Sequence, residues 1–436
     1  MGSELMKKYD VGIIGAGPAG LAAAFALQAQ GKQVVMIESY LWGGTCPNYG
    51  CDPKKVLLAA VEAKEYAQLL QGKGVQGVPT INWPELMTSK KTFTDPVSRG
   101  TFGSVTAAGI TTYQGKARFQ SATEVLVANE RITADNWIIA TGARPATLTV
   151  PGGELAKTSE DFLGMEKLPA SITFVGAGYV ALELAVIANA AGSNVQILTH
   201  GETILPAFDQ ELVADFVEQL TQRGIKIVKN VAVTALAQQE NTIEITTATE
   251  NYRSEMVIAA TGRPANIDDL NLDALDVEWS RHGIKVDQQL RTGAQNIFAI
   301  GDVADTAVPK LTPVGSFEGR YVAAVLAGNQ EPIQYTAIPT VVYGAPKLAQ
   351  AGAVATATTF DVTGWFTYRR IGENVAKVKI ATNEVGQLIG ASVLATEADQ
   401  LINYLTNAIN QKWTLADAQA NIMAYPTMAS DLQYFF

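Results

Sequence analysis

A glycine turn between a strand and a helix occurs twice in the chain, in YDVGIIGAGPAGLAAAFAL at 9–27 and ASITFVGAGYVALELAVIA at 170–188. Each is followed later by an apolar strand that ends in Ala-Thr-Gly, in DNWIIATGARP and in EMVIAATGRPAN. Helix and strand patterns alternate through most of residues 8–330, which favours parallel sheets covered by helices. The sequence therefore predicts an α/β protein with two Rossmann-like nucleotide-binding domains, the second lying within the span of the first.

The pattern changes after residue 330. The segments PTVVYG, WFTYRR, NVAKVKIA and GQLIGASVLA are typical of antiparallel strands, and an amphipathic helix is expected near 396–411. This predicts a separate α+β domain at 331–436. The first nucleotide-binding domain is then expected at 1–147 and 265–330, and the second at 148–264.

Charge and hydropathy exclude several kinds of partner. The chain has 436 residues, is 47% hydrophobic and carries a formal charge of −10 with no block of like charge. Such a surface has no basic face for nucleic acid or for an anionic membrane. The early apolar stretch carries Asp10 and regularly spaced glycines, unlike a signal peptide, and no run reaches about 18 apolar residues. We expect a soluble, cytoplasmic protein that acts on small molecules.

The first glycine turn has the spacing of a dinucleotide site. Gly15, Gly17 and Gly20 directly follow a strand and open a helix, so they can turn tightly and admit a pyrophosphate near the backbone. Glu38 ends the next strand, about twenty residues on, where a carboxylate holds a ribose hydroxyl. Strand, glycines, helix and acid together predict a bound dinucleotide.

The second turn has Gly176, Gly178 and Ala181, but its next strand ends in Thr199 and His200 instead of an acid. A free ribose 2′-hydroxyl therefore has no carboxylate partner there, which favours NADPH. NADH stays possible, because no arginine follows that could bind a 2′-phosphate. His200 is interpreted mainly as a surface turn residue, with phosphate contact as the alternative.

Two cysteines, Cys46 and Cys51, occur in the segment GGTCPNYGCDPKK. Zinc needs further ligands, and the only histidines, His200 and His282, are distant in sequence, so no metal site is predicted. Residues five apart in a helix have Cα atoms roughly 8–9 Å apart, more than a disulfide allows. We therefore expect a distorted helix, with Gly50 and Asn48 at the distortion, and a strained, reducible disulfide. Two buried structural thiols are the alternative.

The cysteine segment resembles the active-site motif of the class I pyridine nucleotide-disulfide oxidoreductases, the glutathione reductase and dihydrolipoamide dehydrogenase family. The resemblance covers essentially the whole chain, through both glycine turns, both Ala-Thr-Gly turns, NIFAIGDVAD, LTPVGSFEGR, IPTVVY and AYPT. It implies that Asp302 holds the ribityl chain of FAD, that Lys54 pairs with Glu183 beside the flavin, and that Tyr179 covers the nicotinamide pocket. It also implies further cofactor-binding residues at Gly44, Thr45, Thr141, Gly142 and Gly262.

The implied reaction passes electrons from NAD(P)H through FAD to the Cys46–Cys51 disulfide. By this likeness Cys51 lies against the flavin, while Cys46 attacks an incoming disulfide and Cys51 resolves the mixed disulfide. A homodimer is also implied, in which the AYPT segment completes the site of the neighbouring subunit.

The chain departs from the family pattern at its C-terminal segment. The family has His-Pro-Thr followed by a glutamate, whereas this chain has Tyr425 at the histidine position and Ser430 at the glutamate position, followed by Asp431. A phenol with a pKa of about 10 is a poor base near pH 7, so Tyr425 is expected to donate a proton or simply to pack. Asp52, directly after the second cysteine, replaces an apolar residue and disfavours a nearby thiolate.

The main functional prediction is an FAD-dependent NAD(P)H oxidoreductase that reduces a disulfide or a related electrophile. Glutathione is disfavoured, because the first helix carries Phe25 and Ala26 where glutathione reductases tend to have arginine. Because Tyr425 stands at the position of the family histidine, two alternative functions stay open. One is a flavin-dependent reductase of a quinone, or of a carbon–sulfur or carbon–carbon bond. The other is a non-catalytic flavin redox sensor.

Overall fold

The computed structural model describes residues 8–435, so the first seven residues of the domain predicted at 1–147 and the last residue of 331–436 lie outside it. The chain divides into two compact units. The first unit comprises residues up to 54, 89–146 and 263–334, and the second comprises 55–88, 147–262 and 335 onward. Two helices have residues in both units, namely α3 (Cys51–Leu69) and α4 (Trp83–Thr94).

The first unit is built on a seven-stranded sheet in the order β3-β2-β1-β6-β5-β4, with β16 paired to β6. Strands β1, β2, β3, β6 and β16 are parallel, as predicted, whereas β4 and β5 add an antiparallel edge that the sequence analysis did not anticipate. The strands of this sheet are β1 (Lys8–Ile14), β2 (Val34–Glu38), β3 (Thr111–Gln114), β4 (Arg118–Ser121), β5 (Glu124–Val127), β6 (Glu130–Ile139) and β16 (Ile297–Ala299).

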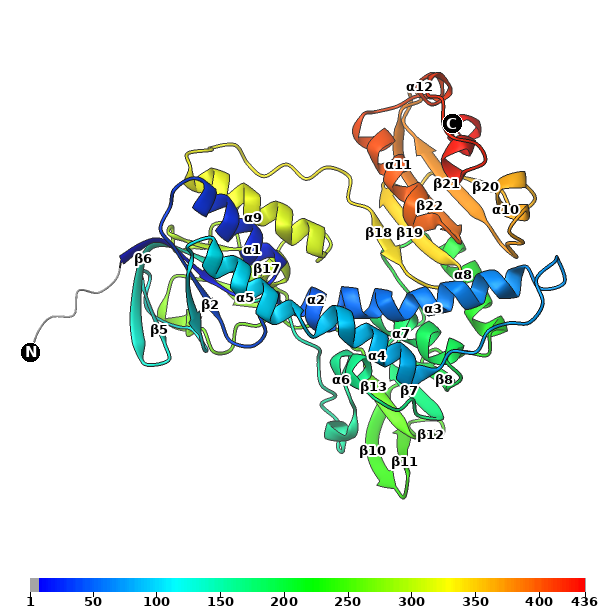
Figure 1. The fold of residues 1–436 in the computed structure, drawn as a ribbon, viewed down its shortest axis with the longest axis horizontal. Coiled ribbons are helices and arrows are strands. Elements are labelled where there is room, and N and C mark those ends of the chain that lie inside the picture. The colour runs from blue at the N-terminus through cyan, green and yellow to red at the C-terminus, as the bar shows by residue number, and fades with distance from the viewer. Residues whose placement is uncertain (1–7, 436) are drawn as a thin grey trace, which may run out of the picture. The chain divides into compact units, whose positions relative to one another are not determined.

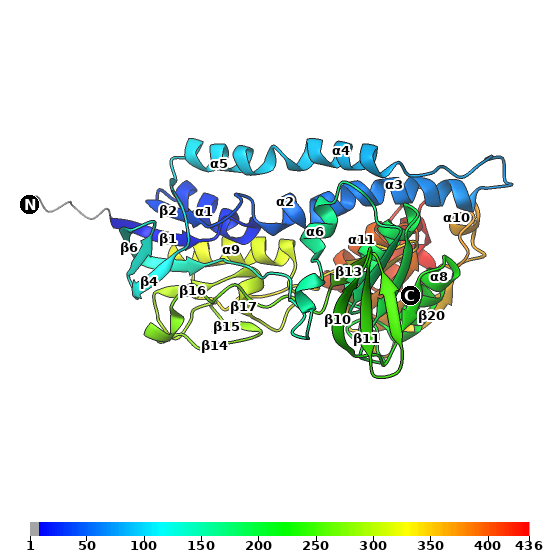
Figure 2. The same ribbon diagram turned by 90° about the horizontal axis from the view of Figure 1, so that it is seen from below.

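Two helices of the first unit lie side by side, as Figures 1 and 2 both show. These are α1 (Pro18–Ala29) and α9 (Thr312–Leu326). Small residues let their backbones approach, since a Cβ at Gly319 would lie 2.4 Å from the Ala19 carbonyl oxygen. The unit also contains α2 (Thr45–Tyr49), α5 (Val97–Ala107), η2 (Leu272–Ala274) and η3 (Gly301–Val303), and a small sheet of β14 (Trp279–Ser280), β15 (Gly283–Lys285) and β17 (Ala304–Asp305).

A glycine inside β1 shows how side chains set the packing of this sheet. Gly12 pairs in register with Trp137 of β6. A Cβ at Gly12 would lie 2.2 Å from the Trp137 ring, which is fully buried. The indole therefore occupies the space that a side chain on β1 would need, and the strand ends are held in fixed register.

The second unit contains a parallel sheet in the order β13-β7-β8-β9, as predicted for the second nucleotide domain. Beside it lies an antiparallel sheet of β10, β11 and β12, whose β10–β11 hairpin is the green pair in Figures 1 and 2. The elements are η1 (Gly153–Leu155), α6 (Ser159–Gly164), β7 (Ser171–Val175), α7 (Tyr179–Ala190), β8 (Asn194–Leu198), α8 (Gln210–Gln222), β9 (Lys226–Val228), β10 (Val233–Gln239), β11 (Thr242–Thr247), β12 (Asn251–Ser254) and β13 (Met256–Ala259).

The C-terminal part of the second unit is a five-stranded antiparallel sheet in the order β18-β19-β22-β21-β20. The predicted antiparallel pairing of strands is confirmed, and the helix expected near 396–411 is α11. The elements are β18 (Thr340–Val342), β19 (Lys347–Gly352), β20 (Thr358–Asp361), α10 (Phe366–Arg369), β21 (Lys377–Thr382), β22 (Leu388–Ala395), α11 (Ala398–Asn410), α12 (Leu415–Ala420) and η4 (Met428–Tyr434).

One strand prediction in this domain is wrong. The segment WFTYRR forms a short helix, α10, instead of a strand. Thr367 and Tyr368 are consecutive and both buried, whereas Phe366 is 56% exposed. An alternating strand cannot bury two successive side chains on one face, so packing overrides the strand preference of the aromatic residues.

Candidate functional site

The glycine turn between β1 and α1 requires residues without side chains at two of its positions. Gly15 has a φ of +107°, and a Cβ there would lie 2.3 Å from the Ala140 carbonyl oxygen. A Cβ at Gly20 would lie 2.0 Å from the Gly15 carbonyl oxygen. Gly17 is open by contrast, because the nearest atom to its Cβ would be the Gly44 Cα, 3.9 Å away. The turn leaves bare backbone at the helix N-terminus, where a pyrophosphate can approach.

The carboxylate of Glu38, at the end of β2, is fixed beside this turn. Glu38 is 8% exposed. Its Oε2 accepts a hydrogen bond of 2.8 Å from the Ala16 N–H, and its Oε1 accepts one of 2.8 Å from the Tyr40 N–H. A carboxylate in this position binds the ribose hydroxyls of a dinucleotide in folds of this type. The glycine turn and Glu38 therefore fit the adenosine half of FAD.

The second glycine turn, between β7 and α7, repeats the backbone geometry of the first. Gly176 also has a φ of +107°, and its Cβ would lie 2.4 Å from the Ala260 carbonyl oxygen. Among the described residues, no atom lies within 4 Å of a Cβ built at Gly178. Ala181 is fully buried on α7. The turn presents open backbone at Gly178, which corresponds to Gly17 in the first turn.

The residues around the second turn differ from those around the first. Thr199 follows β8 directly and is 8% exposed, and its N–H donates to the Val228 carbonyl at 2.9 Å. His200 is exposed, in agreement with a surface turn position. Tyr179 begins α7 and is 43% exposed. Its role over a nicotinamide stays a prediction.

The two Ala-Thr-Gly turns use glycine for its backbone conformation. Gly142 has a φ of +69° and Gly262 a φ of +130°. Thr141 contacts Asn266, since its Oγ1 donates to the Asn266 carbonyl at 2.7 Å. The Asn266 N–H in turn donates to the Gly142 carbonyl at 2.9 Å. These bonds fix the first turn, while cofactor contact by either turn stays a prediction.

The two cysteines lie on either side of a break between α2 and α3, which follow one another in Figure 1. Gly50 has φ −132° and ψ −110°, far from helical values. A Cβ at Gly50 would lie 2.8 Å from the Thr45 carbonyl oxygen. The expected helix distortion is therefore confirmed. It brings the Cys46 and Cys51 thiols within hydrogen-bonding reach of each other.

The start of the cysteine segment contacts the first glycine turn. Gly44 has a φ of +68°, and a Cβ there would lie 2.7 Å from the Gly17 Cα. The Asn48 side chain donates to the carbonyls of Trp42 at 3.0 Å and Gly44 at 2.9 Å, which holds this stretch in place. The cysteine pair therefore follows directly after backbone that borders the dinucleotide turn.

The two sulfurs have different surroundings. The half-buried Cys46 has its Sγ 4.0 Å from the Asp52 Oδ1, whereas the Cys51 Sγ lies 4.0 Å from the Thr312 Oγ1 on the first turn of α9. The hydrogen bond with Cys51 raises the pKa of Cys46 most, burial and the charges of Cys51 and Asp52 raise it further, and Thr312 opposes this. These surroundings disfavour the thiolate form of Cys46.

Asp302 lies in η3, in a turn that α9 supports. The Gly301 N–H donates to the Glu318 Oε2 at 2.6 Å, and Glu318 is only 1% exposed. The Lys310 ammonium donates to the Asp302 carbonyl at 2.8 Å. Burial raises the pKa of the Asp302 carboxyl, while the charges of Arg263 and Lys310 act in the opposite direction. Its contact with a ribityl chain stays a prediction.

Glu183, on α7, is buried and is contacted by the second of the two lysines that follow the cysteines. The Lys55 ammonium lies 3.6 Å from the Glu183 Oε2 and 3.4 Å from the centre of the Tyr343 ring. The Tyr343 N–H donates to the Glu183 Oε1 at 2.9 Å. The pairing of Lys54 with Glu183 stays a prediction.

The C-terminal segment places Tyr425 on the surface of the second unit. Its side chain is 71% exposed, and its ring stacks on that of Phe366 with centroids 6.1 Å apart. A stacked, exposed phenol of this kind is suited to contact another surface. Its catalytic role stays a prediction.

The residues that follow Tyr425 are turned inward. Thr427 caps η4, and the Ser430 Oγ accepts from the Thr427 N–H at 3.3 Å and donates to the Thr427 carbonyl at 2.6 Å. Asp431 is 6% exposed, and burial raises the pKa of its carboxyl, opposed by a hydrogen bond with Thr367. Asp431 is thus oriented into the domain core and does not accompany Tyr425 on the surface.

Sequence reasoning missed four residues that contact the predicted site residues. Thr312 and Glu318 both lie in LTPVGSFEGR, which had been used only as a mark of family resemblance. A buried acid between an aromatic residue and a glycine on a helix of small residues was a usable signal for Glu318. Lys310 and Lys55 gave no such signal, because surface lysines are common.

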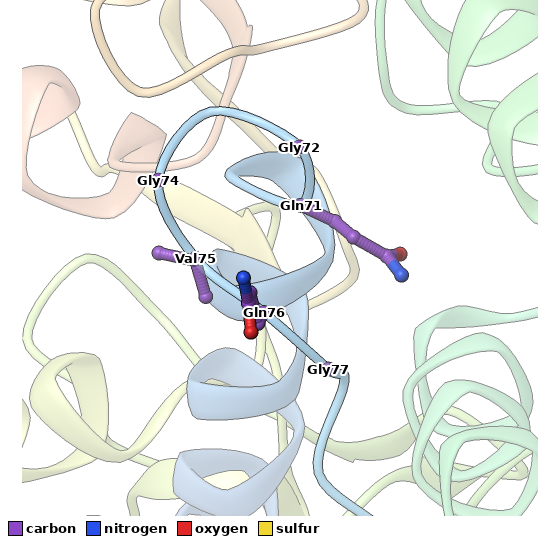
Figure 3. Close-up of a pocket in the computed structure, with 6 residues that line it drawn as sticks. All are labelled: Gln71, Gly72, Gly74, Val75, Gln76 and Gly77. Atoms are coloured by element: carbon purple, nitrogen blue, oxygen red, sulfur yellow. The ribbon is translucent and has the colours of Figure 1, made fainter.

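Other features of the described residues carry no redox chemistry. A pocket of about 440 Å³ in the loop between α3 and α4 is drawn in Figure 3, and it is lined by Gln71, Gly72, Gly74, Val75, Gln76 and Gly77. None of these side chains can act as a nucleophile or a strong acid or base. Within residues 8–435, no helix has the length and hydropathy to cross a membrane, and no three His, Cys, Asp or Glu side chains gather as metal ligands would.

Two dinucleotide turns, with a cysteine pair beside the first, define a flavin-dependent pyridine-nucleotide oxidoreductase. Comparison with known families gives the same result. Residues 9–319 match the model of the pyridine nucleotide-disulphide oxidoreductases, and residues 338–434 match the dimerisation domain of the same proteins. The chain belongs to the pyridine nucleotide-disulphide oxidoreductase family.

Curated relatives extend over nearly the whole chain. The chain is 31% identical to a glutathione reductase of Burkholderia cepacia, covering 98% of each protein. It is 30% identical to a dihydrolipoyl dehydrogenase of Halobacterium salinarum, covering 96% of this chain and 94% of the relative. The predicted family, α/β fold and enzyme class are therefore confirmed, and the protein is an FAD-dependent NAD(P)H oxidoreductase that acts on disulfides.

Among solved structures, the chain resembles the HOCl-induced flavoprotein disulfide reductase RclA from Escherichia coli. That structure has a TM-score of 0.88 at 23% identity, covering 98% of this chain and 99% of the other. The Cu(II) complex of a cysteine-to-serine mutant of RclA has a TM-score of 0.89 at 24% identity, covering 99% of both chains. At these identities the likeness establishes the shared fold.

Proposed function

We propose that the chain is an NADPH-dependent disulfide reductase in which Cys46 and Cys51 form the exchange pair. The observation that carries this proposal is the break at Gly50, which leaves the two sulfurs adjacent next to the first dinucleotide turn. NADPH is preferred to NADH because Thr199, at the end of β8, occupies the position that the acid Glu38 occupies at the end of β2.

The chain supplies binding surfaces for both cofactors. Gly15, Gly17 and Gly20 receive the pyrophosphate of FAD, Glu38 its ribose, and Asp302 its ribityl chain. When bound, the nicotinamide and the flavin supply two electrons to the cysteine pair. Further FAD contacts are assigned to Gly44, Thr45, Thr141 and Gly142, and the NADPH contacts to Gly176, Gly178, Tyr179, Ala181, Thr199, His200 and Gly262.

The reduced pair then exchanges with a disulfide acceptor. Cys46 attacks one acceptor sulfur as its thiolate, the acceptor S–S bond breaks, and the proton that Cys46 gives up is taken by the leaving sulfur. Cys51 then attacks the Cys46 sulfur, which releases the second acceptor thiolate and restores the disulfide. The Cys51 sulfur lies 4.0 Å from the Thr312 hydroxyl on the first turn of α9, which supports this assignment because a helix N-terminus favours an anionic sulfur.

The remaining assignments concern assembly. We assign Lys54 and Glu183 to a pair beside the flavin, the FAD domain to 1–147 and 265–330, and the NADPH domain to 148–264. A homodimer through 331–436 is supported by the dimerisation-domain match and by the exposure of Tyr425. In this dimer Tyr425 contributes a hydrogen bond to the neighbouring site in place of the family histidine.

The exchange pair is tested by counting thiols. Anaerobic treatment of the oxidised, flavin-loaded protein with NADPH should expose two additional titratable thiols per chain. Replacing either cysteine, in Cys46→Ser or Cys51→Ser, should lower kcat for a small disulfide by about 10³-fold or more, because the exchange has no second sulfur. Unchanged disulfide turnover in either variant contradicts the proposal.

A second candidate function is favoured by Tyr425, because an acceptor that releases no thiolate leaving group tolerates the loss of the family histidine. Quinones and Cu(II) are the acceptors to compare, the latter because RclA is described as a Cu(II) complex. Quinone turnover that survives Cys46→Ser supports a reductase independent of the thiols. Bound FAD without turnover of any acceptor supports a redox sensor instead.

A further inference from the structure

An acidic side chain stands next to the sulfur that meets the acceptor. Asp52 lies on the first turn of α3, is exposed, and has its Oδ1 4.0 Å from the Cys46 Sγ. An aspartate carboxylate is negatively charged at neutral pH. Any disulfide that reacts with Cys46 must bring its own sulfur within bonding distance of that atom, and the groups attached to it then come close to the Asp52 carboxylate.

The two lysines that follow in the same segment have other surroundings. Lys54 is only 8% exposed. The Lys55 ammonium contacts Glu183 and the Tyr343 ring. The Cys51 side of the pair is bordered by the neutral Thr312 hydroxyl. The Asp52 carboxylate, 4.0 Å from the Cys46 sulfur, places a negative charge beside it.

A fixed charge at this distance changes how acceptors bind. Two unit charges a few ångströms apart at a protein surface interact strongly enough to change a rate or binding constant about tenfold. The effect attracts an acceptor whose groups beside the S–S bond are positive and repels one whose groups are negative. It acts on the approach of the acceptor to the Cys46 sulfur.

We propose that Asp52 is a specificity-determining residue that selects cationic disulfides over anionic ones. The inference rests on the proposed reductase function and names the charge class of its acceptor. It also accounts for the departure of the CDPKK segment from the apolar residue usual after the second cysteine.

The test uses three small disulfides of similar length that differ in charge. These are cystamine, which is cationic, bis(2-hydroxyethyl) disulfide, which is neutral, and 3,3′-dithiodipropionate, which is anionic. The parent protein should show kcat/KM falling in that order at low ionic strength. Asp52→Asn should lower the ratio of cystamine to dithiodipropionate about tenfold and change the neutral disulfide less than about threefold.

Three controls separate local charge from other effects. Glu130→Gln removes an exposed carboxylate at the start of β6, the strand end opposite to the one that enters the Ala-Thr-Gly turn, and should leave the ratio unchanged. Asp52→Glu should keep the preference. Raising the salt concentration from about 20 mM to about 500 mM should reduce the ratio several-fold in the parent protein and have little effect in Asp52→Asn.

The outcomes distinguish this inference from the function on which it rests. If none of the three disulfides is turned over by the parent protein, the reductase function itself is overturned. If all three are turned over and Asp52→Asn keeps the parent ratio within about twofold, charge selection by Asp52 is overturned. If the Asp52→Asn variant loses its flavin, the parent protein alone supplies the test. A cystamine-to-dithiodipropionate ratio that does not change with salt then overturns charge selection by Asp52.

Discussion

The two dinucleotide turns share one backbone geometry. They differ at the end of the strand that comes after the helix, β2 in the first case and β8 in the second. Gly15 and Gly176 have the same φ of +107°, and each excludes a Cβ through a carbonyl oxygen of the strand that ends in Ala-Thr-Gly. At the strand ends, however, Glu38 accepts two backbone hydrogen bonds in the first turn, whereas Thr199 occupies the second. The glycines thus make the turn, and the strand end is where the two sites differ in charge.

This division of roles means that substitutions at the glycines and at the strand ends have different consequences. Where a Cβ would clash with neighbouring atoms, replacing the glycine destabilises the fold. An open glycine or a strand-end residue affects mainly the ligand. Three substitutions test this distinction.

The largest effect is expected for Gly15→Ala. Strain at a positive φ and a clash with a backbone carbonyl should lower the free energy of unfolding by about 3 kcal/mol or more, and most of the FAD should be lost. Thermal melting and the ratio of flavin to protein absorbance measure both effects. Gly100→Ala, at an open position in α5, is the matched control and should be neutral or slightly stabilising. A parental melting temperature with full flavin would falsify the prediction.

An intermediate effect is expected for Glu38→Gln. The substitution removes a charge-assisted acceptor from two backbone N–H groups and from the ribose, which should weaken FAD binding about 10- to 100-fold, or roughly 1.5–3 kcal/mol. The FAD dissociation constant is measured by titrating the flavin-free protein. The KM for NADPH should change less than about twofold, because the second turn is untouched. An equal loss in both constants would contradict the separation of the two turns.

The smallest effect is expected for Thr199→Glu, which gives the second turn the acid of the first. A carboxylate there repels a 2′-phosphate and accepts a hydrogen bond from a free 2′-hydroxyl. The ratio of kcat/KM for NADPH to that for NADH should fall about tenfold. Thr199→Gln, similar in size and uncharged, should change the ratio much less. A ratio that does not respond to the acid would show that this strand end does not contact the ribose.

The sequence was informative wherever the relevant contacts are local. Gly15, Gly20 and Gly176 were identified because a tight strand-to-helix turn requires them within a few residues of the strand. The break between Cys46 and Cys51 followed from the reach of a disulfide along a helix. The second glycine turn was identified with the same argument, so both nucleotide domains were predicted from their own segments.

Contacts between distant parts of the chain could not be predicted in this way. Thr312 reaches Cys51 across 261 positions, and Glu318 reaches Gly301 across 17. The sequence around Glu318 marks that residue but not its partner, and the contact between Thr312 and Cys51 has no local signal. The helix in WFTYRR was missed for the same reason, because the burial of Tyr368 depends on packing that β-propensity does not report.

The bend at Gly50 has a practical consequence for anyone who wishes to retune this redox pair. A side chain at that position would collide with the carbonyl oxygen of Thr45. The Asn48 side chain already donates hydrogen bonds to the carbonyls of Trp42 and Gly44. Substituting Gly50 is therefore not a practical way to change the distance between the two sulfurs. Their reactivity is open to adjustment through the charges placed around them.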